Sequence, residues 1–261
     1  MITQPRKWGG DLLFLLENLI LKDFRIRYRN MSLGVLWSLI NPLVMIGVMT
    51  FVFSKVFIGD KSITAYPLFI LCGLIPYNFF ANAFLTGTIS ILDSAGLVKR
   101  LAVPREVIPV ASVLSNCVHL IIQFLLLVAF ALFFHLPPAM PWLWLPVIWA
   151  LYILFVIGLA LGASAVNVFI RDTRYVVESF NLVLFWLVPI FYPFSYIQPK
   201  YRPIYEFNPV AALVMAMRNI LIDRQPPAES LVRNMFIAAV VTMTLGLLLF
   251  RRLKPHFYEH L

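Results

Sequence analysis

The stretch "LKDFRIRYRNMSLGVLWSLINPLVMIGVMTFVFS", residues 21–54, joins a cluster of cations to a long apolar run. Its first ten residues include Lys22, Arg25, Arg27 and Arg29, and no charged side chain follows in the rest of it. A helix that spans a bilayer needs about twenty successive apolar residues. The stretch therefore predicts a transmembrane helix with a basic anchor at its entrance.

The composition extends this interpretation to the whole chain. Of 261 residues, 61% are hydrophobic and only 13% are charged, and the mean hydropathy is +0.88. Soluble domains are about half apolar and about one quarter charged. A net charge of +9 would suggest nucleic acid in a soluble protein, but here membrane lipid is the expected surrounding and no nucleic-acid partner is expected. The fold class predicted is an all-α integral membrane protein.

Six apolar runs are long enough to be spans, the fifth being the shortest: 33–55, 66–92, 107–134, 143–168, 176–193 and 231–250. They divide the chain into a cytoplasmic tail with an amphipathic helix (1–32), a six-helix transmembrane domain (33–250) and a cytoplasmic C-terminal tail (251–261). A cytoplasmic N-terminus puts 14 of the 21 Lys and Arg residues in cytoplasmic segments, as the positive-inside rule requires. Both termini are therefore expected in the cytoplasm.

Residues 8–30 have the pattern of a helix that lies in the membrane surface. At helical spacing one face carries Asp11, Asn18, Lys22, Arg25 and Arg29, and the opposite side carries Leu12, Leu16, Leu19, Ile20 and Phe24. Asp23 and Arg27 interrupt the apolar side, so we expect protein to cover part of it. The alternative is an ordinary charged tail before the first span.

The predicted spans contain almost no ionisable group, and His119 is the one titratable side chain placed deep within them. Ion-coupled transporters and pumps usually need such groups, so this class is disfavoured. The sequence has no Walker A motif and no metal-ligand spacing, so we expect no catalytic residue, metal site or cofactor. An active transporter of this kind needs an ATPase partner, whereas a channel needs none.

Neutral amides and aromatic rings supply the polarity of the spans. The amides are Asn41, Asn78, Asn82, Asn116, Gln123, Asn167 and Asn181. Amides satisfy sugar hydroxyls without trapping them, and aromatic rings stack on sugar C–H faces, so the pattern suits a pore for a sugar chain. An interfacial belt is the alternative for many of the aromatic residues.

Two loops stand out. The cytoplasmic loop 93–105 carries an apolar strip flanked by cations, made of Leu97, Val98, Lys99, Arg100 and Leu101. Such a strip indicates a soluble partner, although a plain interfacial loop is an alternative. In the outer segment 193–230, Asn208–Pro209 starts an apolar helix too short to span, which fits a re-entrant or surface helix. Gly158 and Gly162 in the fourth span permit close helix packing.

Four stretches together, in this order, resemble a known family: "LKDFRIRYRNMSLGVLWSLINPL", "LVKRLAVPREVIPVASVLS", "NVFIRDTRYVVESF" with "PIFYP", and "FNPVAALVMAMRNIL". They are similar to the permease subunits of ABC exporters that move polysaccharides on polyprenyl lipid carriers. That family handles lipopolysaccharide O-antigens, capsules and wall teichoic acids. The resemblance covers nearly the whole chain.

The resemblance implies a six-helix permease without an ATP site of its own, acting as a homodimer with two copies of an ABC ATPase. It makes 8–30 an interface helix, 94–103 a coupling helix that docks the ATPase, and 193–230 the outer gate helices. It also implies an aromatic conduit between the first and fifth spans. The motif "RDTR", Arg171–Arg174, matches the family's charged pattern, and either lipid-diphosphate binding or helix anchoring would explain it.

These considerations predict export of a polyprenyl-diphosphate-linked polysaccharide, first of all an O-antigen, across the bacterial inner membrane. Six residues are candidates for substrate binding: Lys22, Arg25 and Arg29 for the diphosphate, and Phe51, Trp186 and Tyr192 for the sugar. Simple anchoring is the alternative for the three cations. Export of teichoic acid or capsule, an intramembrane polyprenyl-phosphate sugar enzyme and a passive channel are the alternative functions.

Overall fold

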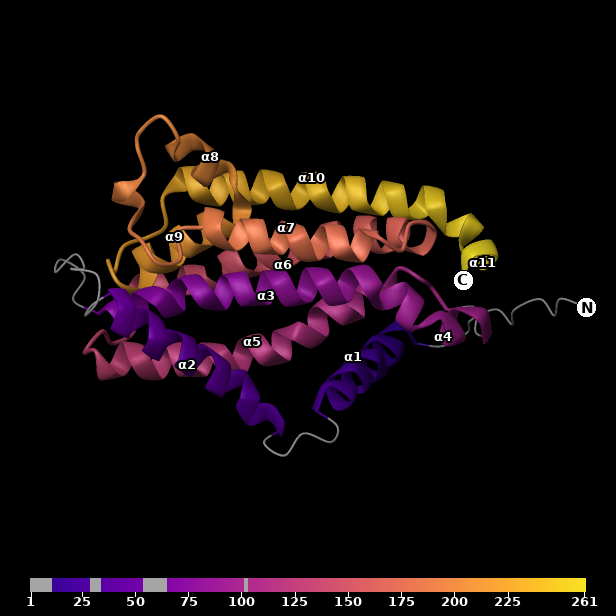
Figure 1. The fold of residues 1–261 in the computed structure, drawn as a ribbon, viewed down its shortest axis with the longest axis horizontal. Coiled ribbons are helices and arrows are strands. Elements are labelled where there is room, and N and C mark those ends of the chain that lie inside the picture. Colours follow the sequence, from indigo (N-terminus) through magenta and orange to yellow (C-terminus); the bar gives the residue numbers. More distant parts are fainter. Residues whose placement is uncertain (1–10, 29–33, 54–64, 101–102) are drawn as a thin grey trace, which may run out of the picture.

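The computed structural model describes residues 11–28, 34–53, 65–100 and 103–261, and every regular element within these ranges is helical. Four of the predicted spans are confirmed as helices long and apolar enough to cross a bilayer. They are α3 (Tyr66–Asp93), α5 (Val107–Phe133), α6 (Leu145–Phe169) and α10 (Glu229–Leu253). The long helices run side by side along one axis (Figure 1).

The first and fifth predicted spans are shorter helices, α2 (Trp37–Phe51) and α7 (Thr173–Leu187), of 15 residues each. The ends of the run 33–55 lie partly outside the described residues. Helix α7 ends six residues before the predicted boundary, because Val188 precedes Pro189 and is extended, with φ −80° and ψ 136°.

Helix α3 forms the centre of the fold, in contact with α2, α5, α6, α7 and α9 (Pro209–Leu221). Next to it, α6 packs closely against α10 at glycines, as the spacing of Gly158 and Gly162 predicted. A Cβ atom on Gly158 would collide with the backbone of Thr242 and Met243, and one on Gly246 with the backbone of Gly158. The two backbones therefore meet where no side chain separates them.

The outer segment folds into α8 (Arg202–Phe207) and α9, as the helix start at Asn208–Pro209 predicted. The Asn208 side chain caps α9 by accepting a hydrogen bond from the Val210 N–H, at 3.0 Å. Nearly every residue of α9 is buried, because the helix inserts between α3, α6 and α10. The helix is thus buried within this chain, and the choice between a re-entrant helix and a helix at the membrane surface stays a prediction.

Helix α1 (Leu12–Tyr28) packs against α5, so protein covers part of it as predicted. The covered side is centred on Leu15 and Leu19, whereas Leu12 is exposed, so the apolar face is rotated from the one predicted. Two further helices, α4 (Ala95–Arg100) and α11 (Phe257–His260), lie with the C-terminus at one end of the bundle, opposite α8 and α9 (Figure 1). The 3₁₀ turns are η1 (Gly34–Leu36), η3 (Met140–Trp144), η4 (Phe194–Tyr196) and η5 (Lys254–His256).

Candidate functional site

A cavity of about 450 Å³ lies between α2, α3 and α5. We call it the amide cavity, because five of the seven amides singled out from the sequence line it. Its wall is made of Trp37, Ser38, Asn41, Pro42, Asn78, Phe79, Asn82, Thr86, Asn116, His119, Leu120 and Gln123. The fold therefore gathers neutral polar groups from three separate spans into one place.

Hydrogen bonds within the chain hold several of these side chains in position. The Asn82 amide nitrogen donates to the Asn78 carbonyl at 2.8 Å, and the Thr86 hydroxyl donates to the Asn82 carbonyl at 2.8 Å. The buried Asn116 amide donates to Thr86 Oγ1 at 3.0 Å and to the Ser112 carbonyl at 2.8 Å. The Asn116–Thr86 bond joins α5 to α3, so the cavity wall is a fixed structure.

The position of these amides makes lipid an unsuitable neighbour. Asn78 and Asn82 lie near the middle of α3, and Asn116 and Gln123 near the middle of α5. Asn41 and Asn82 are nonetheless exposed on the surface of this chain. Hydrocarbon offers no hydrogen-bond partner, and polar side chains within spans face protein or a water-filled cavity. The amide cavity therefore opens onto a polar space or a second protein surface.

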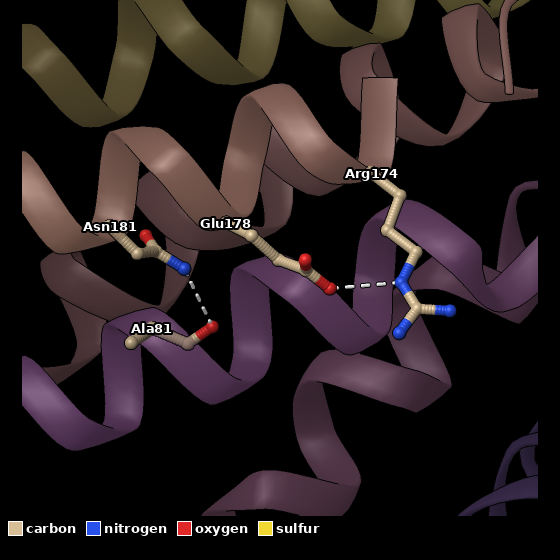
Figure 2. Close-up of polar contacts among 4 residues, drawn as sticks. All are labelled: Ala81, Arg174, Glu178 and Asn181. Carbon is tan, nitrogen blue, oxygen red and sulfur yellow. Dashed lines mark hydrogen bonds and ion pairs between the residues drawn. The ribbon is translucent and has the colours of Figure 1, made fainter. Parts of the chain in front are cut away.

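The two other amides lie away from the amide cavity. Asn167 and Asn181 are buried, and Asn181 on α7 donates through Nδ2 to the Ala81 carbonyl of α3 at 3.1 Å (Figure 2). The Tyr77 hydroxyl donates in turn to the main-chain carbonyl of Asn181 at 2.7 Å. These two bonds attach α7 to α3, so Asn181 holds two helices together.

The "RDTR" motif begins α7, and Arg174 forms an ion pair with Glu178 one turn later, Nε to Oε1 at 2.9 Å (Figure 2). The Arg174 side chain is exposed and that of Glu178 is partly buried, so solvent screens the pair and it contributes little to stability. Arg174 thus remains accessible, and the choice between anchoring and phosphate binding stays open.

The three predicted aromatic contacts have different surroundings. Phe51 and Trp186 are 62% and 67% exposed, so neither is required for packing within one chain. Tyr192 is half-buried, with its hydroxyl 3.4 Å from that of Tyr205. The first and fifth predicted spans do meet, through Phe53 stacked on Phe191 with ring centroids 6.0 Å apart.

A second cavity, of about 480 Å³, is lined by residues of α1, α3 and α5, and we call it the inner cavity. Lys22, Asp23, Asp93 and Thr86 are among its lining residues, and Lys22 and Arg25 are both exposed. Lys22 Nζ lies 3.9 Å from Asp23 Oδ1, a weak contact that leaves the ammonium available. Arg29, the third predicted cation, lies outside the described residues.

The predicted docking strip on α4 is less open than its sequence suggested. Val98 is only 1% exposed because it packs into the hydrophobic core of its own chain, and Leu97 is half-buried against the same core. Lys99 is exposed. Leu101 and the side chain of Arg100 lie outside the described residues. Among the described residues, a partner could therefore contact Lys99 and the exposed side of α4.

Sequence reasoning did not single out Arg218, whose guanidinium is buried at the end of the fold that holds α8 and α9. Its Nη2 donates to the Ile190 carbonyl at 2.8 Å, and longer contacts reach the carbonyls of Tyr192 and Phe69. The guanidinium carbon also lies 3.4 Å from the centre of the Phe69 ring. The sequence did contain a signal for Arg218, because a basic residue stands within an otherwise apolar helical stretch. Trp37 and Thr86, likewise not chosen, line the amide cavity because of how α2 and α3 are rotated.

Comparison with known proteins gives a consistent result. The model of the ABC-2 type transporter family matches residues 15–222. The chain is 29% identical to the O-antigen export system permease protein RfbA of Klebsiella pneumoniae over 250 residues, covering 95% of this chain and 94% of that protein. It is 27% identical to the Myxococcus xanthus protein of that name, covering 88% of each chain. It is 23% identical to the polysialic acid transport protein KpsM of Escherichia coli, covering 90% of this chain and 92% of that protein.

Proposed function

The chain belongs to the ABC-2 type transporter family, and from that premise we propose that it exports a polysaccharide linked to a polyprenyl diphosphate. The observation that carries the proposal is the amide cavity, a set of neutral hydrogen-bonding groups near the middle of the membrane helices. The full-length similarity to O-antigen export permeases supports an O-antigen as the first choice of polymer. Capsule and teichoic acid are the alternatives, the former because of the polysialic acid relative.

As a multi-pass membrane subunit of this family the chain has no ATPase domain of its own, and membership implies an ABC ATPase partner. We propose a homodimer with two ATPase copies, each docked on 94–103 through Lys99 and the exposed side of α4. In this arrangement α2 and α7 complete six spans within 33–250, between the cytoplasmic segments 1–32 and 251–261. The bacterial inner membrane, with both termini in the cytoplasm, is the proposed location.

The proposed conduit uses uncharged groups for the sugar chain. Amides exchange hydrogen bonds with sugar hydroxyls at a net strength of about 1 kcal/mol each, weak enough for the chain to move on. Exposed aromatic residues add stacking faces, for which Phe51, Trp186 and Tyr192 are the proposed residues. In the homodimer these surfaces would face the partner copy or the conduit, and not lipid.

We propose that Lys22, Arg25 and Arg29 receive the diphosphate at the inner leaflet. Each juxtamembrane cation contributes about 1 kcal/mol near an anionic surface. An intramembrane sugar-processing enzyme is the second candidate, and it would need converging acidic or metal-binding groups. Within the described parts of the chain, no group of three His, Cys, Asp or Glu side chains could hold a metal ion.

Complementation tests the proposed function. The chain would be expressed with an ABC ATPase of an O-antigen exporter, in a strain that makes a polyprenyl-linked O-antigen but lacks its own exporter. Surface polymer should appear on intact cells, detected by antibody, and should be absent with a hydrolysis-deficient ATPase. Intracellular accumulation of the polymer, despite a folded and assembled complex, would refute the proposal.

The proposed orientation has a separate test. In a Cys72→Ala/Cys117→Ala background, Lys99→Cys should react with a membrane-impermeant maleimide only after the cells are opened. Gln198→Cys, exposed in the opposite segment, should react in intact cells. Labelling of position 99 from outside would invert the topology.

A further inference from the structure

The amide cavity has a polarity that discriminates between classes of polysaccharide. We propose that it selects polymers whose sugar units are uncharged, and discriminates against polymers that carry a carboxylate or phosphate in each repeat. The inference rests on the proposed function and adds the class of sugar chain that the chain transports. Three observations support it: the absence of fixed charge in the cavity wall, the presence of charge in the neighbouring cavity, and the commitment of amide nitrogens to the chain itself.

Fixed charge is absent from the wall. Among the described residues that line the amide cavity there is no Asp, Glu, Lys or Arg, and His119 is the one titratable side chain. An anion moved into a low-dielectric site without a counter-charge loses far more solvation free energy than a hydroxyl does. A hydroxyl loses little, because an amide can replace water as both donor and acceptor. The cavity wall therefore suits neutral sugars.

Charge appears instead in the inner cavity, which shares Thr86 with the amide cavity. Lys22, Asp23 and Asp93 line it, together with the buried hydroxyl residues Ser90, Ser94, Ser112 and Ser115. The two cavities thus adjoin along the seam between α3 and α5, and the charged groups, one cation and two carboxylates, are confined to the end near α1. This division lets the diphosphate bind at Lys22 while the attached sugar meets only neutral groups.

The amide nitrogens are partly committed within the chain. The Asn82 nitrogen donates to the Asn78 carbonyl at 2.8 Å, and the Gln123 nitrogen approaches the Ser38 carbonyl at 3.5 Å. A primary amide has two N–H donors, so each of these two bonds leaves one N–H and the carbonyl oxygen for a ligand, whereas the Asn116 nitrogen donates twice within the chain. The carbonyl oxygens accept from a sugar hydroxyl and repel a carboxylate, so this part of the hydrogen-bonding capacity favours neutral sugars.

Ligand binding gives the first test, because Trp37 lines the cavity and reports on it. The purified complex in nanodiscs would be titrated with a neutral hexose oligomer and with the hexuronate oligomer of equal length, which differs by a carboxylate at C6. Tryptophan fluorescence should change at a concentration about tenfold lower for the neutral oligomer, and Trp37→Phe should remove the part of the change that Trp37 reports. Equal or tighter binding of the acidic oligomer, or no binding of the neutral one, would overturn the inference.

A charge placed in the cavity gives the second test. Asn82 is exposed to the cavity, so Asn82→Lys introduces a cation there and should reduce the neutral preference about tenfold. Gln198→Lys adds the same charge at an exposed position outside the cavity and should leave the preference unchanged. An unchanged preference in folded Asn82→Lys protein would contradict the inference.

Export assays separate this inference from the proposed function. Two strains would supply the same polyprenyl-linked polymer with and without a carboxylate in each repeat. Preferential export of the neutral polymer supports both statements. Equal export of the two polymers refutes the selectivity and leaves the proposed function intact, whereas export of neither refutes the proposed function.

Discussion

Helix α3 separates two sides of the molecule that use polar groups differently (Figure 1). On the side of α6, α9 and α10, the buried polar groups include the cation Arg218 together with Asn167 and Asn234, and the apolar part of the span is 61% buried for α6 and 28% buried for α10. On the side of α1, α2 and α5, neutral amides line the amide cavity, the charged groups Lys22, Asp23 and Asp93 line the inner cavity, and 22% of the corresponding part of α5 is buried. One side thus encloses a cation, and the other leaves neutral amides accessible.

The difference suggests a division of labour. Arg218 donates its hydrogen bonds to the chain's own carbonyls, so it stabilises the fold and offers little to a ligand. The amides of the cavity wall keep hydrogen-bonding capacity that lipid cannot satisfy, so they are suited to a passing substrate. We call the side of α6, α9 and α10 the closed side, and the side of α1, α2 and α5 the open side. Substitutions on the closed side should change stability, and substitutions on the open side should change transport.

The largest effect is expected from Arg218→Met. Loss of the guanidinium leaves the buried carbonyls that it contacts without a donor, at a cost of about 1–3 kcal/mol for each such group. We expect a loss of roughly 3 kcal/mol, or a thermal midpoint roughly 10 °C lower, measured by fluorescence-detected size exclusion after heating in detergent.

Arg218→Lys is the matched control. It keeps the charge but not the planar fork that reaches two carbonyls and stacks on Phe69, so an intermediate midpoint is expected. Arg218→Met protein as stable as the wild type would break the comparison, because the buried cation would then contribute nothing to the closed side.

A smaller loss is expected from Gly158→Ala, also on the closed side. The added Cβ collides with the α10 backbone, which cannot move aside as a flexible side chain could. Overpacking of this kind costs about 1–3 kcal/mol. Gly47→Ala in α2 is the control, since a Cβ there meets nothing within 4 Å. Equal thermal midpoints for the two variants would contradict the close backbone contact between α6 and α10 at Gly158.

On the open side, Asn82→Leu should lower transport without lowering stability. Loss of one sugar hydrogen bond, about 1 kcal/mol, corresponds to roughly a fivefold lower export rate. Asn181→Leu is the counterpart, because Asn181 attaches α7 to α3 and its loss should lower the thermal midpoint first. If Asn82→Leu instead destabilised the protein as much as Asn181→Leu does, the cavity amides would be packing residues.

Much of this arrangement could be predicted from the sequence. The spans that became α3, α5, α6 and α10 follow from run length, and the α9 start follows from Asn208–Pro209, because both depend on local chemistry. The amides were identified as a group, but which of them would meet depends on helix rotation. Asn82 and Asn116 therefore lie at one cavity while Asn181 does not.

The errors have a tertiary origin. Val98 belongs to an apolar strip in the sequence, but it is buried in the hydrophobic core of its own chain. No local pattern distinguishes a strip that packs against the core from one that binds a partner. Arg218 was overlooked because the carbonyls that satisfy it come from two distant segments, at Phe69 and at Ile190 to Tyr192. Only the folded chain brings those segments together.

The smallest effect on stability is expected from the ion pair that joins the two sides at the end near α11. Lys254, after α10, donates from Nζ to Glu106 Oε1 at 2.7 Å, just before α5. Burial raises the pKa of Glu106, but the hydrogen bond from Lys254, a backbone hydrogen bond and the charges of Lys254 and Arg251 together outweigh it and hold the pKa below its ordinary value. Because the folded pKa is lowered, the stabilisation is present above the ordinary Glu pKa of about 4.3 and is lost as pH falls through the folded value.

Glu106→Gln should therefore lower the free energy of unfolding by less than about 1 kcal/mol at pH 7, because both partners are partly exposed. The difference from the wild type should vanish as the pH falls below about 4, measured as the difference between their thermal midpoints. Arg105 limits the loss, since it donates independently to the Lys254 carbonyl at 2.7 Å and lies over the Tyr258 ring. If the thermal midpoint of Glu106→Gln stays below that of the wild type by the same amount at low pH, then packing, and not the ion pair, joins the closed and open sides.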